Sequence, residues 1–432
     1  MLTRCRRVTR AWPELARVVA AIAAVGLSVG VAATLVALLL HLVQHLAYGY
    51  ADDTFLNGVE QSDALRRLLA PTVGIGLTGL GWMWLRRRPL PEVGDACAPR
   101  PRRLPLGRTV LDAALQIVAV GSGASIGREG APRQVGAALA STLSSMLAAR
   151  TDLRRRLVVA GAGAGLAVVY NVPLSGVVFG AEVLAGGFGL GGLLISIPVC
   201  VLAVAVSWLV LGTGSTYVYP DAGLTLPTLV WAVVAVPLCA VVGSLFDAFM
   251  RWCRRFRPGP GWSLPVAAAL GGLAVGLASV WLPSLPGNGK GIVQLALGGG
   301  GSLLVFAVLV AAKPVATGIT YGSGVTGGFL TPALGTGAAL GAMVAMIGDS
   351  SGQAWSVPAF ALIGAVGVLA AMQRAPWFAA VFGWELARPP VLMLVLLVVV
   401  AWGAAPLARQ LAWHGRGRTA ERRTRDEREG FE

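Results

Sequence analysis

The chain has 432 residues, of which 56% are hydrophobic and only 13% are charged, and its mean hydropathy is +0.72. Because an ordinary soluble domain carries about a quarter charged residues, this composition excludes that class. A net charge of +15 would suggest nucleic-acid binding in a soluble protein, but here the arginines lie beside apolar runs. The positive-inside rule explains that placement, so we expect no nucleic-acid partner and both termini in the cytoplasm.

Long apolar runs recur from one end of the chain to the other. The first, residues 18–42, follows a basic N-terminus and is far longer than a signal-peptide core of about 7–15 residues, so it predicts a first membrane helix. Runs at 193–211 and 226–245 also have the length, about 20 residues, that crosses a bilayer. The sequence predicts an all-α, multi-pass protein of the plasma membrane.

Cysteine and histidine patterns point to neither a disulfide framework nor a metal centre. The five cysteines are scattered without CxxC spacing. His41 and His45 lie four apart on one expected helix face and could in principle share a metal, but a place near the membrane interface explains them as well. We expect no metal and no cofactor.

Two blocks of the sequence occur twice, at a spacing of about 200 residues, which is the pattern of an internal repeat. Aligning "AGAGLAVVYNVPLSGVVFGAEVLA" with "AVGVLAAMQRAPWFAAVFGWELA" sets Pro173 against Pro376. The same alignment matches Glu182 with Glu385. Upstream, "GREGAPRQVGAALA" aligns with "GGFLTPALGTGAALG" in the same order.

The repeat predicts two homologous transmembrane halves with a substrate site at their interface, as in many transporters. The sequence by itself leaves open whether the halves run parallel or inverted. Apolar segments interrupted by Gly or Pro predict broken helices, whose N-termini favour a nearby anion. The expected boundaries are a cytoplasmic segment 1–14, a first repeat 15–212, a linker 213–224, a second repeat 225–412 and a charged, disordered or weakly helical cytoplasmic tail 413–432.

Three ordered motifs resemble the CLC family of chloride channels and chloride/proton exchangers. They are "GSGASIGREGAPRQVG", "AGAGAGLAVVYNVPLSGVVFGAEVL" and "YGSGVTGGFLTPALGTG", and the resemblance covers nearly the whole chain. It implies an inverted-repeat fold with broken and tilted helices, a homodimer with one anion pathway per subunit, and chloride as the bound substrate ion. The tail is too short for the nucleotide-binding CBS domains that some members carry.

By motif position, Glu129 would be the gating glutamate of that family. A carboxylate is itself an anion, so it can occupy a site built from helix N-termini until protonation or a permeating anion removes it. The alternative is a structural ion pair with Arg128 or Arg133. The resemblance implies that the anion site is lined by Gly127, Arg128, Gly130, Ala131, Gly328, Phe329, Leu330 and Thr331.

Some of these residues have simpler explanations. Phe329 and Leu330 are also what an ordinary apolar core contains. Glu182 and Glu385 occupy matching positions in the two repeats. This match favours a structural role, in which they brace the two halves, over a direct role in transport.

Four departures from the family pattern bear on mechanism. Arg88 in "RRPLP" stands near the position of the family's anion-ligating serine, and Ala408 stands where its final-helix tyrosine is expected. The glutamate motif reads GREGA instead of GREGP, and Val183 replaces the inner glutamate of proton-coupled members. A one-residue slip would give that role to Glu182, but the match with Glu385 argues against it.

These departures favour uncoupled or weakly proton-coupled anion transport. Stoichiometric chloride/proton antiport, and transport of another anion such as fluoride or nitrate, stay open. An intramembrane enzyme is disfavoured because no Ser/His dyad, aspartate pair or HExxH motif occurs in an apolar span.

Overall fold

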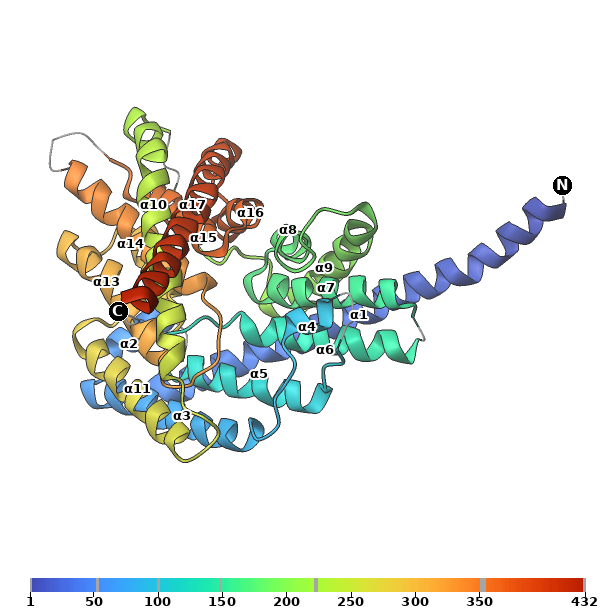
Figure 1. The fold of residues 1–432 in the computed structure, drawn as a ribbon, viewed down its shortest axis with the longest axis horizontal. Coiled ribbons are helices and arrows are strands. Elements are labelled where there is room, and N and C mark those ends of the chain that lie inside the picture. The colour runs from blue at the N-terminus through green and yellow to red at the C-terminus, as the bar shows by residue number, and fades with distance from the viewer. Residues whose placement is uncertain are drawn as a thin grey trace.

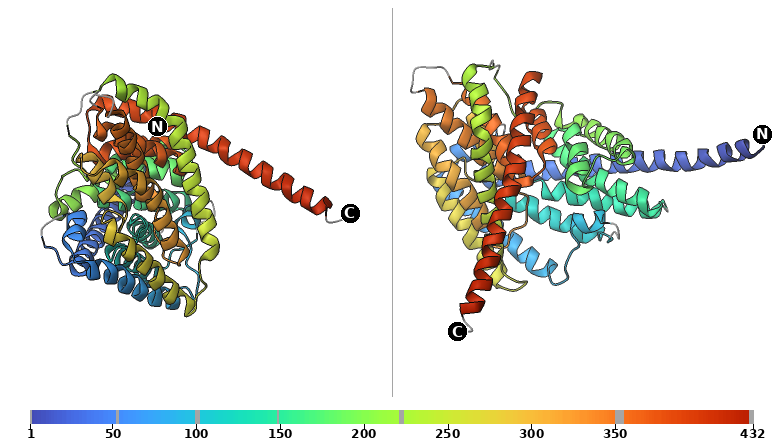
Figure 2. Two further views of the ribbon diagram at one scale, coloured as in Figure 1. Left: turned by 90° about the vertical axis from the view of Figure 1, so that its left-hand side faces the viewer. Right: turned by 45° about the horizontal axis from the view of Figure 1, so that its top comes forward.

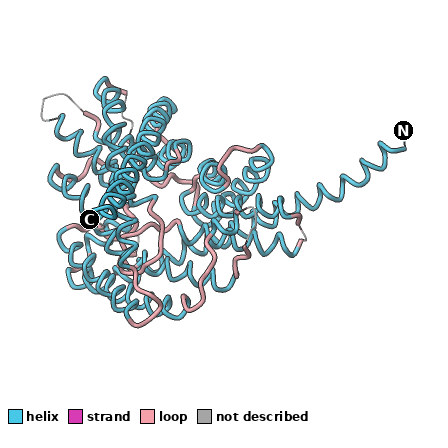
Figure 3. The backbone as a smooth tube through the Cα atoms, in the orientation of Figure 1, coloured by secondary structure: helices cyan, strands magenta, loops and turns pink. Residues whose placement is uncertain are grey.

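The computed structural model describes residues 2–429 except 52–53, 99–101, 148, 221–223 and 350–354, and for residues 2–13 and 413–429 it describes the backbone only. Every regular element within this part is a helix, and Figure 3 shows these helices joined by loops. In chain order they are α1 (Leu2–Tyr48), α2 (Phe55–Gln61), α3 (Ala64–Leu85), α4 (Val93–Cys97), α5 (Leu106–Gly121), α6 (Gly130–Met146), α7 (Thr151–Tyr170), α8 (Pro173–Val178), η1 (Phe179–Leu184), α9 (Leu190–Leu211), α10 (Leu226–Cys253), η2 (Arg254–Phe256), α11 (Ser263–Trp281), α12 (Lys290–Leu297), α13 (Leu303–Gly322), α14 (Leu330–Asp349), α15 (Val357–Gln373), α16 (Pro376–Ala387) and α17 (Val391–Glu429).

Eight of the described helices are long and apolar enough to cross a membrane, namely α1, α3, α9, α10, α11, α13, α14 and α17. Large apolar side chains such as Leu209, Val233 and Leu304 are exposed on them, as lipid rather than water requires. In α14, 78% of the most apolar stretch is buried in protein, against 33–44% in the other seven. This burial places α14 at the centre of the bundle, and the predicted all-α, multi-pass architecture is confirmed.

The two ends of the chain project from the bundle as single helices (Figures 1 and 2). The backbone of α17 stays helical to Glu429. The charged tail expected at 413–432 therefore continues a membrane helix, and its side chains lie outside the described residues. The expected linker 213–224 lies between the end of α9 and the start of α10.

The internal repeat reappears as repeated backbone conformation. Asn171 caps the C-terminus of α7 and Arg374 caps that of α15, and these two residues have left-handed φ angles of 55° and 58°. Pro173 and Pro376 follow, each at the start of the next helix, where proline costs no hydrogen bond. Equivalent sequence positions therefore make equivalent turns in the two halves.

Small residues bring the central helices into backbone contact in both halves. A Cβ added at Gly337 in α14 would collide with the carbonyl oxygen of Gly364 in α15, and one added at Gly364 would collide with that of Gly337. Gly136 in α6 and Gly161 in α7 make the same reciprocal contact in the first half. Glycine is what permits helices in a membrane bundle to approach so closely.

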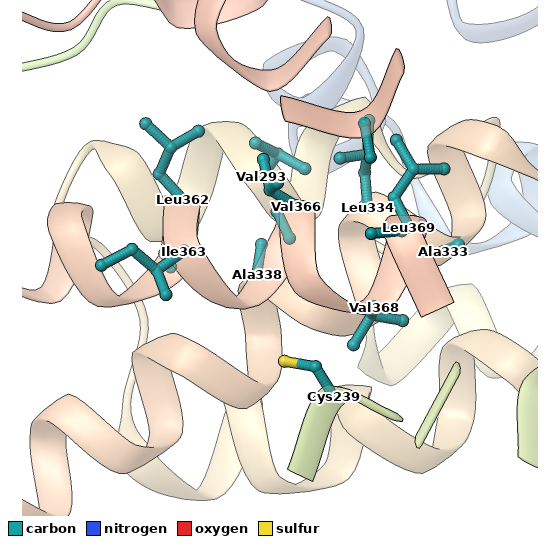
Figure 4. Close-up of a cluster of buried hydrophobic side chains, with 14 of the residues drawn as sticks. Cys239, Val293, Ala333, Leu334, Ala338, Leu362, Ile363, Val366, Val368 and Leu369 are labelled. Carbon is teal, nitrogen blue, oxygen red and sulfur yellow. The ribbon is translucent and has the colours of Figure 1, made fainter. Parts of the chain in front are cut away.

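The largest apolar core among the described residues lies around the contact between α14 and α15. It is built from the second half and the helices that pack against it (Figure 4). Cys239 of α10 packs beside Val368 of α15, and Val293 of α12 and Ala338 of α14 belong to the same cluster. This core packs around α14, and Leu330 at the start of that helix is 3% exposed.

Replacing Gly337 with alanine should separate α14 from α15 and destabilise the protein by about 1–3 kcal/mol, the usual cost of overpacking. The measurement is the apparent melting temperature of the detergent-solubilised protein. Gly192 in α9 is the matched control, because a Cβ there meets no atom within 4 Å. Equal melting temperatures for Gly337→Ala and Gly192→Ala would contradict the close contact.

Candidate functional site

Glu129 lies fully buried at the contact between the two halves, with 0% of its surface exposed. It immediately precedes α6, and its carboxylate reaches across to the start of α14. Oε1 accepts a hydrogen bond from the backbone N–H of Leu330 (2.8 Å). Oε2 accepts from the hydroxyls of Thr331 (3.2 Å) and Tyr170 (3.3 Å). A carboxylate from the first half therefore caps a central helix of the second.

A short backbone bridge brings the two motifs together at this point. The N–H of Gly127 donates to the carbonyl of Gly328 (2.7 Å), and the N–H of Gly328 donates back to Gly127 (2.9 Å). A Cβ at either glycine would occupy the position of the Glu129 carboxyl group. Both positions must be glycine for the side chain to lie where it does.

Neither neighbouring arginine pairs with the carboxylate. Arg133 donates from Nε to the backbone carbonyl of Glu129 (2.9 Å), and its guanidinium lies 5.1 Å from the ring centroid of Phe179. Arg128 donates from Nη2 to the carbonyl of Val169 (2.9 Å). Among the described side chains no ion pair includes Glu129, so the structural ion pair considered above is not formed.

Two cavities approach Glu129. We call the one on the expected cytoplasmic side, where the N-terminus lies, the inner cavity, and the one on the opposite side the outer cavity. The inner cavity, about 630 Å³, lies at the C-terminal end of α3 and reaches Gly130, Gly327 and Phe329. The outer cavity, about 350 Å³, lies at the C-terminal end of α1 and reaches Arg128. Because the residues before and after Glu129 line different cavities, the buried carboxylate lies between them.

The inner cavity is strongly basic. Its acidic lining residues in the described chain are Glu92 and Asp112, and Asp112 is bonded to the indole N–H of Trp82 (2.8 Å) and the amide of Gln116 (2.8 Å). A cavity with such an excess of positive side chains concentrates anions. The basic lining residues are Arg86, Arg88, Arg133, Arg254 and Arg257.

The remaining residues expected to line an anion site are distributed around the carboxylate. Gly130 and Ala131 are the first two residues of α6. Their N–H groups therefore have no carbonyl four residues earlier in that helix to bond. Phe329 lines the inner cavity and packs edge-on against Tyr321, with ring centroids 4.9 Å apart. Leu330 has a buried side chain and contributes its backbone N–H.

Tyr170 is a residue that the sequence analysis missed. It ends α7, is 1% exposed, and its hydroxyl contacts both Glu129 and Thr331 (3.4 Å). The available signal was its place directly before the Asn-Val-Pro turn, which brings α7 to the contact between the halves. Ala408, where the family's tyrosine was expected, is instead buried in the apolar core.

Glu182 and Glu385 each accept hydrogen bonds from backbone N–H groups of the other half. Glu182 accepts the backbone N–H groups of Trp377 (3.3 Å) and Phe378 (2.6 Å) at the start of α16. Glu385, within α16, accepts the N–H of Ser175 (2.6 Å) at the start of α8. Each carboxylate thus stabilises the N-terminus of a helix in the other half, where the helix dipole favours negative charge. Neither residue lines the inner or the outer cavity.

Sequence comparison identifies the family. The profile of the family described as "Voltage gated chloride channel" matches residues 76–406. The chain belongs to this family. A putative chloride channel protein ClcB-like of Ralstonia nicotianae is 31% identical over 355 residues, which are 78% of this chain and 82% of that protein. The voltage-gated ClC-type chloride channel ClcB of Escherichia coli is 31% identical over 299 residues, or 67% and 70% of the two chains.

Solved structures of the same type share the fold. One is of a slow cyanobacterial Cl⁻/H⁺ antiporter, with a TM-score of 0.76 and 21% identity over 91% of this chain and 95% of that one. Another is of a CLC-type fluoride/proton antiporter, with a TM-score of 0.71 and 21% identity over 92% and 96%. These comparisons confirm the CLC fold and the family, and anion transport is the activity of the family.

Replacing Tyr170 with phenylalanine removes one donor from the Glu129 carboxylate. One such hydrogen bond contributes about 1 kcal/mol, so a competing anion should displace the carboxylate at about fivefold lower concentration. The measurement is the chloride concentration for half-maximal flux from proteoliposomes, in the wild-type and in the Glu129→Ala background. A shift that persists without the glutamate would mean that the hydroxyl acts on the anion directly.

Proposed function

We propose that the protein conducts chloride, or a similar small anion, across the plasma membrane along a path that the Glu129 carboxylate closes. The observation that carries this proposal is a fully buried carboxylate between the inner and outer cavities, held by the N–H at the start of α14. A glutamate with a purely structural role would not need to lie between two polar cavities.

The donors that hold the carboxylate are also suited to an anion. The Leu330 N–H would otherwise be buried without an acceptor, which is costly, and the hydroxyl of Thr331 beside it is a second donor. When Glu129 takes up a proton its side chain loses the charge that these donors favour, and an anion can replace it. Flux should therefore depend on both pH and anion concentration.

The basic inner cavity supplies the anion from the expected cytoplasmic side. Arg88 occupies this lining, near the place of the expected serine, so it adds charge where the family pattern has a neutral ligand. Gly127, Gly130, Ala131 and Gly328 shape the narrow segment between the cavities and provide backbone N–H groups in our proposal.

We propose that coupling to protons is absent or weak. Val183 is partly buried and packs against the apolar core, so it carries no proton at the position expected for an inner glutamate. The alternative is stoichiometric anion/proton antiport, the activity named for the two similar solved structures.

We also propose the assembly and orientation. The subunit pairs as a homodimer, both termini lie in the cytoplasm, and the repeats comprise 15–212 and 225–412 with Glu182 and Glu385 as structural carboxylates between them. The arginine clusters beside the apolar helices support the orientation.

Glu129→Gln should make anion flux insensitive to pH, because glutamine cannot exchange a proton and carries no charge to compete with the anion. The measurement is chloride efflux from proteoliposomes between about pH 3.5 and about pH 6.5, which spans the ordinary pKa of a glutamate, about 4.3. Glu60→Gln, at an exposed position in α2, is the matched control and should keep the wild-type profile. The proposal is wrong if Glu129→Gln retains the wild-type pH dependence.

An outward chloride gradient should move no protons against their own gradient if coupling is absent. The measurement is internal pH followed by a trapped dye while chloride, nitrate or fluoride flux is recorded in the same vesicles. Proton movement driven uphill by any of these anions would establish the antiport alternative and would name the anion.

A further inference from the structure

The outer cavity has an unusual chemical lining. It is built from the C-terminal end of α1, from α2, from Arg128 and from the start of α12. Its described lining residues include no aspartate or glutamate. The polar and basic ones are His41, Gln44, His45, Tyr50, Thr54, Arg128, Asn288, Lys290 and Gln294.

Two donors in this lining are buried without an acceptor. Asn288 is 7% exposed, and its Oδ1 accepts the backbone N–H of Lys290 (3.2 Å), which fixes the orientation of the amide. Its Nδ2 group, on the other side of the amide, has no partner. The Nε of Arg128 is also buried without a partner. Because buried donors in proteins are normally satisfied, two in one cavity require an explanation.

The cavity also places positive groups close together. Burial, followed by repulsion from Arg128, lowers the pKa of Lys290 to about 8. Lys290 forms no ion pair with a described residue, and the three ion pairs among the described side chains lie elsewhere. A negative ligand would satisfy the free donors and offset this repulsion at once.

We propose that the outer cavity binds one small monovalent anion between Asn288, Lys290 and Arg128, as a waiting site for the transported halide on the far side of Glu129 from the inner cavity. This inference deepens the proposed function and rests on it for the identity of the ligand. The sequence places the site next to the closing carboxylate, because Arg128 directly precedes Glu129 and lies 4.7 Å from the ring centroid of Tyr170.

The assignment to a halide follows from the proposed function, and the free donors fit a spherical ion. The Nδ2 group of Asn288 and the Nε of Arg128 come from different residues, and Arg128 already gives one N–H of Nη2 to the carbonyl of Val169. Arginine can also bind phosphate or a carboxylate through two parallel N–H groups, so the experiment compares the halide with phosphate.

The test is anomalous diffraction from crystals of the full chain grown in sodium bromide. We expect a bromide peak in the outer cavity within about 3.5 Å of the Asn288 amide nitrogen. Asn288→Asp retains the oxygen that accepts the Lys290 N–H and exchanges the free donor for a negative oxygen, so the peak should disappear. Asn57→Asp in α2, whose residue is not among those lining the cavity, is the matched control and should leave the peak in place.

Flux provides the second readout. Asn288→Asp should raise the chloride concentration for half-maximal flux at least about tenfold when chloride is varied on the outer face. The value for the inner face should not change.

The outcomes separate the two proposals. Wild-type protein that transports chloride but shows no bromide in the outer cavity overturns the waiting site and leaves the proposed function intact. Displacement of bromide by inorganic phosphate at lower concentration than by chloride overturns the assignment to a halide. Failure of the wild type to move any anion, with bromide still bound, overturns the proposed function alone.

Discussion

The structure depends on carboxylates of one half that accept hydrogen bonds at helix N-termini of the other. Glu129 reaches α14, Glu182 reaches α16 and Glu385 reaches α8. In a bilayer no water is available to satisfy either the buried carboxylate or the first N–H groups of a helix. Each therefore satisfies the other, and broken helices that would be costly alone become stable where the two halves meet.

The same hydrogen bond, from a helix N-terminus to a carboxylate, occurs at Glu129, Glu182 and Glu385, but the three carboxylates have different surroundings. Glu385 is 7% exposed and Glu182 is partly exposed, and neither lines the inner or the outer cavity, so no cavity leads an anion to the N–H groups that they bond. Glu129 lies between two polar cavities, and in the function that we propose an anion from either side takes its place. In that proposal, access to a cavity distinguishes the carboxylate that closes the path from the two that brace the halves.

The sequence predicts the all-α fold and the family because both follow from local and repeated patterns, such as the proline after each left-handed cap. The repeat placed the substrate site at the interface of the halves, but the backbone bridge between Gly127 and Gly328 was not predicted. Tyr170 was not predicted, because a tyrosine in an apolar helix has the pattern of a core residue. Asn288 and Lys290 were not predicted either, since the glycines and prolines that lead into α12 have no periodicity that indicates which side chains face a cavity.

The placement of polar groups also bears on coupling. Strict exchange requires a proton and an anion to reach the central carboxylate by different routes, so that each excludes the other in turn. Here Val183 packs into the apolar core, while Asp112 lines the inner cavity beside the arginines that attract anions. A proton from the inner side would then share the cavity with the anion. A shared route imposes no alternation between the two ions, which is the physical reason to expect conduction with little or no proton coupling.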